Sequence, residues 1–198
     1  YMNLETYRYL IPSNLRHSVG QRLIDSSPVV ELNVIDIVKF ILWHPFLPHL
    51  TKYTFLKDGC INRYVGGNWE SFSTEFENDP YYKTFSRYLT NPSESLICDN
   101  DSYFKDWNFI NNGKDINASE KKIKLFDLDF KRYLEIYEDI KINGYKEIGS
   151  YPHGVVGKSG EFYLMGGRHR LTFCKKLGIK TIKVKLLLQH EECINRNL

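Results

Sequence analysis

The fold of this chain is decided at Glu161–Leu186, which reads EFYLMGGRHRLTFCKKLGIKTIKVKL. The apolar run FYLM is followed by a pair of glycines, a segment with helical spacing, and then TIKVKL, in which apolar residues alternate with lysine. Such alternation is typical of a strand, and Gly178 after the helical segment is a common helix C-terminal signal. The stretch therefore predicts a strand, a helix that begins near Arg168, and a second strand.

The residues before this stretch continue the pattern. The segment 121–129, KKIKLFDLD, has alternating apolar positions and predicts a strand. The segment 130–144, FKRYLEIYEDIKING, has an apolar stripe at helical spacing and ends on an Asn-Gly pair. Two short strands joined by a tight turn are expected in 153–165. The order strand, helix, strand, strand, helix, strand predicts a compact α/β (α+β) domain over 121–198.

The first 120 residues are expected to form a separate extension, mostly helical and irregular. VVELNVIDIVKFILW, at 29–43, places its apolar residues on one face of a helix, with Asn33 as the N-cap and Pro45 as the end. Charged residues interrupt this run, so it is not a membrane span. Core packing and peripheral contact with a membrane surface are the two uses open to that face. The segment 51–120 predicts turns and loops, with a helix in DPYYKTFSRYL.

Composition excludes several classes of protein. The chain has 198 residues, 42% hydrophobic and 26% charged, which is ordinary for a globular protein and not for a disordered one. Its net charge of +3 is too small to indicate nucleic acid, although a basic run from Arg168 to Lys185 keeps that partner as a minor alternative. No cysteine pair has metal-binding spacing and no signal peptide is recognisable, so we expect free thiols and a cytoplasmic location.

The glycine pair at the strand–helix junction predicts an anion site. Gly166 and Gly167 allow unusual backbone dihedrals and a close approach by a ligand. The N–H groups at the start of the following helix, together with the helix dipole, attract phosphate, sulfate or carboxylate. His169 and Arg170 add a donor and a guanidinium group. The alternative is a plain architectural junction with a solvated arginine.

The segment YLMGGRHRLTFCKKLGIKTIKVKL resembles the signature of the ParB/sulfiredoxin-like superfamily. The resemblance covers 121–189 and includes the glycine turn, the helix, the Leu177-Gly178 cap and the closing strand. It implies a small mixed sheet with helices that binds ATP, ADP or CTP. In sulfiredoxins a cysteine stands at the position of Arg168, so the resemblance excludes their reductase chemistry. Chromosome-partitioning members carry a DNA-reading helix-turn-helix after this domain, and none is recognisable here.

A third branch of the superfamily, typified by free serine kinases, carries Asp-Gly-His-His-Arg at this turn. Gly167, His169 and Arg170 match that pattern, whereas Arg168 replaces a histidine and Gly166 replaces the aspartate. The resemblance therefore implies that Gly166–Arg170 bind the nucleotide phosphates and that His169 also takes part in catalysis. The lost aspartate leaves the Mg²⁺ or hydroxyl-activating role without its usual residue.

Two aspartates could supply the missing carboxylate. Asp127 and Asp129 are expected where the first predicted strand ends, at the edge where nucleotide-binding α/β sites open. Phosphoryl transfer needs Mg²⁺ at the phosphates and a group that orients the attacking hydroxyl. We expect Asp127 to bind Mg²⁺ and Asp129 to serve the hydroxyl or the metal. The alternative for Asp129 is the N-cap of the helix that begins at Phe130.

These features together favour a nucleotide-dependent kinase that acts on a small hydroxyl compound, such as a sugar or a surface-glycan intermediate. Residues 1–120 would then recognise the acceptor. The rival hypothesis is a regulatory switch that binds ATP or CTP without transferring phosphate, which the absence of an acid at Gly166 favours.

Overall fold

The computed structural model describes residues 27–41, 52–54, 62–65, 69–91, 103, 120–146 and 151–196. In these ranges the chain forms one mixed sheet of eight strands. The strands are β1 (Val29–Asn33), β2 (Lys39–Phe40), β3 (Lys52–Thr54), β4 (Asn62–Val65), β5 (Thr74–Glu75), β6 (His153–Val156), β7 (Phe162–Gly166) and β8 (Thr181–His190). Their order is β3-β4-β8-β6-β7-β2-β5, and β1 also pairs with β8.

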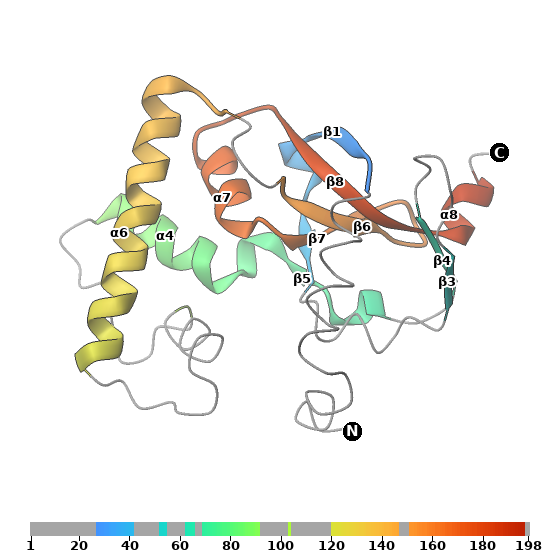
Figure 1. Ribbon diagram of the computed structural model, residues 1–198, viewed down its shortest axis with the longest axis horizontal. Coiled ribbons are helices and arrows are strands. Elements are labelled where there is room, and N and C mark those ends of the chain that lie inside the picture. Colours follow the sequence, from blue (N-terminus) through green and yellow to red (C-terminus); the bar gives the residue numbers. More distant parts are fainter. Residues whose placement is uncertain are drawn as a thin grey trace.

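Helices gather at one end of this sheet. Figure 1 shows α4, α6 and α7 grouped there, while β3, β4 and α8 lie at the other end. The helices are α4 (Pro80–Thr90), α6 (Glu120–Asn143), α7 (Arg168–Lys176) and α8 (Glu191–Arg196), with short 3-10 turns η1 (Val34–Asp36), η3 (Trp69–Phe72) and η4 (Phe76–Asn78). The mixed α/β class agrees with the sequence, as do strand β7, helix α7 and strand β8 in the deciding stretch.

Strand β8 organises the sheet because it pairs with three other strands. It runs parallel to β6 and β4 and antiparallel to β1. Strands β6 and β7 form the expected antiparallel hairpin, and β7 runs parallel to β2. The junction between β7 and α7 therefore starts from a strand that has a hydrogen-bonded neighbour on each side.

The predicted helix over 29–43 is wrong. Its described part forms β1, η1 and β2, and Val29–Asn33 pairs in register with Thr181–Lys185. Exposed and partly buried residues alternate along β1, while Val34 and Ile37 are buried in the core. The backbone of β1 pairs with β8, and Val34 and Ile37 enter the core beyond the end of the strand, so tertiary context overrides the local helical pattern. The predicted helix end at Pro45 lies outside the described residues.

The predicted strand over 121–129 is also wrong, because α6 begins at Glu120 and continues to Asn143. Phe126 and Phe130, four residues apart, are both fully buried, whereas Leu125 is 45% exposed. The apolar stripe at helical spacing thus extends back beyond Phe126 to Ile123, which packs against the same cluster. Asp127 and Asp129 consequently lie within a helix, not at the end of a strand, and Asp129 is not an N-cap.

The sheet takes strands from both sides of residue 120. Strands β1 to β5 precede that position and β6 to β8 follow it. Besides α4 and three 3-10 turns, the described part of 1–120 contributes those five short strands to the sheet, so it is not only helical and irregular. The helix expected in DPYYKTFSRYL is confirmed as α4, which begins at Pro80 after the N-cap Asp79.

Two apolar clusters meet along α7. One lies against the sheet and includes Val34, Ile37, Phe76 and Leu171. The other is largely aromatic and joins α4, α6 and α7. Its members are Tyr81, Phe85, Tyr103, Phe126, Phe130, Tyr137, Ile140 and Phe173. Of the helices in the described ranges, none combines the length and apolar content that crossing a membrane requires.

Candidate functional site

The junction between β7 and α7 is where the sequence predicts an anion site. Gly167 is the N-cap of α7, with φ 91° in the left-handed region and no side-chain cap. The first hydrogen bond of the helix runs from Leu171 N to Gly167 O at 3.1 Å. The N–H groups of Arg168, His169 and Arg170 therefore precede the first acceptor that the helix itself provides, and they lie at its positive end.

The two glycines are also required by packing inside the protein. A Cβ on Gly167 would lie 2.6 Å from Cβ of Pro152, and one on Gly166 would collide with the ring of His153. These neighbours come from β6 and the residue before it. The expected close approach at Gly166 and Gly167 is thus made by the adjacent strand, while the positive φ at Gly167 remains a reason of its own for glycine.

Arg168 ties α7 to α4. Its Nη1 lies 3.3 Å from Oδ1 of Asp79, which is fully buried, and its guanidinium carbon lies 5.5 Å from the ring centroid of Tyr103. The other oxygen of Asp79 accepts a hydrogen bond from Tyr82 N at 3.0 Å and caps α4. The Arg168 side chain is 18% exposed. A phosphate at the turn would have to share this guanidinium group with Asp79.

His169 is enclosed by tyrosine rings. It stacks on Tyr133, with ring centroids 4.0 Å apart, and contacts Tyr81 edge-on at 4.2 Å. Its Nε2 lies 3.3 Å from the hydroxyl of Tyr103. Burial, and then the positive charge of Arg168, lowers the pKa of His169 to about 3. The imidazole is therefore neutral at physiological pH.

We call Tyr81, Tyr103 and Tyr133 the tyrosine cluster. Tyr81 and Tyr103 are 0% and 1% exposed, and burial raises the pKa of all three phenols, which are neutral at ordinary pH. Within the described ranges, the Tyr81 hydroxyl has no hydrogen-bond partner. An unsatisfied buried hydroxyl costs about 1–3 kcal/mol. Sequence reasoning missed this cluster, and the high tyrosine content was its only signal.

Of the two predicted aspartates, Asp129 lies near this cluster. Besides burial, its negative charge raises the pKa of Tyr133 and, more weakly, that of Tyr103. Asp127 and Asp129 are two residues apart on α6, a spacing at which side chains do not face each other. The two carboxylates are therefore not arranged to coordinate the same metal ion.

Few of the described side chains near the turn could act as ligands for a metal ion. No group of three or more His, Cys, Asp or Glu residues in the described part of the chain could hold a metal ion. Mg²⁺ bound with a nucleotide needs only one or two carboxylates, because phosphates and water supply its other ligands. Asp129, partly exposed and beside the tyrosine cluster, fits that limited role better than Asp127.

Arg170 completes the predicted phosphate-binding residues. It is the third residue of α7 and is partly exposed. Burial raises the pKa of Cys174, one turn later, to about 12, and the charge of Arg170 opposes that rise. The buried Cys174 is therefore a protonated thiol without nucleophilic character.

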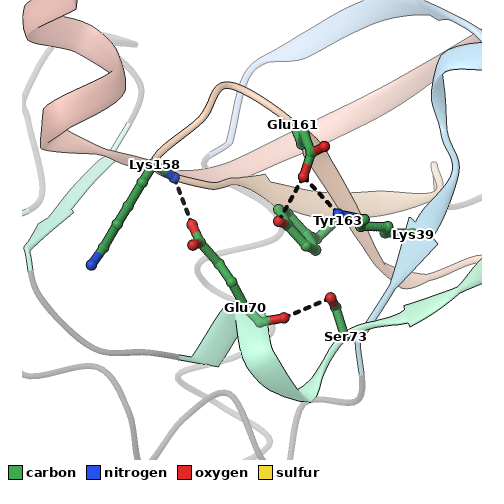
Figure 2. A network of polar contacts seen from close by, with 6 residues as sticks. All are labelled: Lys39, Glu70, Ser73, Lys158, Glu161 and Tyr163. Atoms are coloured by element: carbon green, nitrogen blue, oxygen red, sulfur yellow. Dashed lines mark hydrogen bonds and ion pairs between the residues drawn. The ribbon is translucent and has the colours of Figure 1, made fainter.

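A second polar network anchors the hairpin that leads into the turn (Figure 2). Glu161 accepts hydrogen bonds from Lys39 Nζ and from the Tyr163 hydroxyl, each at 2.9 Å. Glu70 in η3 accepts from the backbone N–H of Lys158 at 2.6 Å. These contacts hold β6 and β7 against β2 and η3. They support the scaffold on the β7 side of the candidate site.

The comparisons with known proteins give no relative. No protein-family model, no curated protein and no solved structure matches this chain. The fold therefore defines the class, mixed α/β, and the site has to be interpreted from its own geometry.

Proposed function

We propose that this protein binds the phosphates of a nucleotide at the start of α7 and phosphorylates a small hydroxylated compound, such as a sugar or a surface-glycan intermediate. The observation that carries the proposal is the glycine-capped start of α7. There, three backbone N–H groups and the partly exposed Arg170 lie at the positive end of the helix. The resemblance to ParB/sulfiredoxin-like kinases points to the same residues.

In this reaction a hydroxyl oxygen of the acceptor bonds to the terminal phosphorus of the nucleotide. The bond between that phosphorus and the bridging oxygen breaks, and the nucleoside diphosphate leaves. Asp129 is the carboxylate best placed to take the hydroxyl proton. When bound, Mg²⁺ would neutralise charge on the phosphates, with Asp129 or Asp127 as its protein ligand.

The main role of Arg168 would be to orient the reacting phosphate, and its contribution to binding the nucleotide would be smaller. Its guanidinium group is shared with Asp79 and lies against Tyr103, so its position is fixed before a ligand arrives. Fixed positive groups beside a transferring phosphoryl group stabilise its charge without reorganisation. His169 is neutral and surrounded by tyrosines. It can form a hydrogen bond with the Tyr103 hydroxyl, but it is a weak base because its pKa is lowered.

A second candidate function is a nucleotide-binding switch without phosphoryl transfer. The observation in its favour is Asp79, the carboxylate bonded to Arg168 beside the turn. Asp79 is fully buried and already accepts from Arg168 and Tyr82 N, so it is poorly suited to contact Mg²⁺ or an acceptor. Under this alternative the nucleotide would change the contact between α4 and α7.

The testing experiment is a calorimetric titration of ATP, ADP and CTP with Mg²⁺. We expect wild-type protein to bind at least one nucleotide and Arg170→Ala to bind it at least about tenfold more weakly, because a charge-assisted phosphate contact is lost. Lys180→Ala is the matched control, since Lys180 is exposed and lies beyond the end of α7. Equal affinity for the two variants would remove the basis of the proposal.

Turnover then separates the two candidates. A phosphorylated sugar or polyol, detected by mass spectrometry and lost in Asp129→Asn, supports the kinase. Nucleotide binding with slow hydrolysis and no phosphorylated acceptor supports the switch.

A further inference from the structure

The Tyr81 hydroxyl is a buried polar group that the described residues leave without a hydrogen-bond partner. It does not lie in a purely apolar surrounding. The phenols of Tyr103 and Tyr133 and the charges of Arg168 and Asp79 all influence its pKa, after burial. The Tyr81 ring lies 4.8 Å from that of Tyr103 and 4.2 Å from that of His169, whose Nε2 is 3.3 Å from the Tyr103 hydroxyl. Polar side chains therefore surround this ring, and a bound group that accepts or donates hydrogen bonds would satisfy the Tyr81 hydroxyl.

The charges around this region decide what kind of group fits. Arg168 is balanced by Asp79, and His169 is neutral because burial lowers its pKa. On α6, Asp129 and Arg132 act on the pKa of Tyr133 with opposite signs, so the charges around this region are mixed. Because charges of both signs offset one another here, an anion gains no net attraction, whereas an uncharged group with hydroxyls can use the hydrogen-bonding groups.

The region is not sealed from solvent. Arg168 is 18% exposed, and Tyr133 and Asp129 are partly exposed, whereas Tyr81 and Tyr103 are buried. The cluster thus reaches solvent along α6 and the first turn of α7. Aromatic rings with a few converging polar groups are the usual lining of small-molecule sites.

We propose that the tyrosine cluster, with His169 and Arg168, binds an uncharged hydroxylated group, a sugar or polyol, through the hydroxyls of Tyr81 and Tyr103. The identification of this group as the acceptor rests on the proposed kinase function, but its binding does not require the nucleotide. The phosphates would lie on the Arg170 side of the turn and the acceptor on the tyrosine side, with Arg168 between the two.

The test is the binding of glucose, N-acetylglucosamine and glycerol to the full chain without nucleotide. Saturation-transfer NMR measures this binding. Tyr81→Phe removes the hydroxyl and keeps the ring. Tyr137→Phe is the matched control, since Tyr137 packs in the same aromatic cluster against Phe85 and Phe173. We expect at least one probe to bind wild type and Tyr137→Phe alike, and Tyr81→Phe about tenfold more weakly. Glucose 6-phosphate should bind more weakly than glucose.

Tyr81→Phe is expected to fold, because it removes an unsatisfied hydroxyl, and a melting temperature at or above that of wild type checks this. Equal affinity of Tyr81→Phe and wild type would overturn the inference, as would the absence of binding by every probe. If ATP binds and no sugar does, this inference fails and the proposed nucleotide site stands. If a sugar binds and no nucleotide does, the tyrosine site stands and the kinase proposal fails.

Discussion

His169 is the residue whose environment departs furthest from what its neighbours in the sequence suggest. It follows two glycines and an arginine, a position that indicates a phosphate ligand, yet its ring lies between Tyr81 and Tyr133. Neither tyrosine is close to it in sequence, so only the packing of α4 and α6 against α7 reveals the arrangement. A histidine held in this way is neutral and orients its neighbours through hydrogen bonding.

This burial makes stability depend on pH. The pKa of His169 is about 3 in the folded protein and 6.5 in the unfolded chain, so between these values only the unfolded state binds the proton. Stability should therefore fall on acidification through this window, by up to about 1.4 kcal/mol per pH unit from this group. The positive charge of Arg168 adds to the effect by disfavouring the imidazolium.

Urea unfolding of wild type and His169→Phe between pH 7 and pH 4 measures this contribution. His153, whose pKa is also lowered by burial, contributes with the same sign in both proteins and cancels in the comparison. We expect a steeper pH dependence for wild type. Parallel curves would show that His169 is protonated in the folded state or exposed.

At the scale of elements, part of the molecule follows from local sequence. Strand β7, helix α7 and strand β8 were predictable because Gly167 and Gly178 mark the helix ends and the apolar periods are clear. The start of α6 was missed because KKIKLFDLD fits both periods over so short a window. Strand β1 was missed because its pairing partner, β8, lies about 150 residues later.

The candidate site divides in the same way. The glycine turn and Arg170 were identified from the sequence, because a strand–glycine–helix junction has a local signature. The ion pair between Asp79 and Arg168 and the convergence of Tyr81, Tyr103 and Tyr133 could not be identified, since each joins segments far apart in the chain. Side chains that come into contact only through tertiary packing produce no periodic pattern in the sequence.

The contact between α4 and α7 can be tested through Asp79. Asp79→Asn keeps an oxygen that can cap α4 and removes the charge opposite Arg168, whereas Asp79→Ala removes both. We expect both variants to be less stable than wild type. The free energy of unfolding of Asp79→Ala should be about 1 kcal/mol lower than that of Asp79→Asn, the usual contribution of an N-cap side chain. Thermal unfolding measures the difference. Equal stability of Asp79→Asn and wild type would mean that the ion pair contributes nothing.

At the scale of the whole molecule, the predicted domain over 121–198 shares its core with residues from before position 120. Strand β8 pairs with β1 and β4, and β7 pairs with β2, all from before residue 120. Val34, Ile37 and Phe76 belong to the cluster that packs against the sheet and α7. The sequence predicts a domain that begins at 121, but the structure that supports the turn is distributed over most of the described chain.

We therefore expect the fragment 121–198 to be unfolded, although sequence analysis presents it as a compact domain. The fragment would lose buried side chains of both clusters, and the loss of Val34, Ile37 and Phe76 alone, at roughly 1.5–3 kcal/mol each, is comparable to the whole stability of a small domain. Its sheet would also have open edges where β1, β2 and β4 pair. Two-dimensional ¹H–¹⁵N NMR of the fragment, with the full chain as control, measures this directly. A well-dispersed fragment spectrum would show that 121–198 folds alone, and the preceding strands would then serve the site and not the fold.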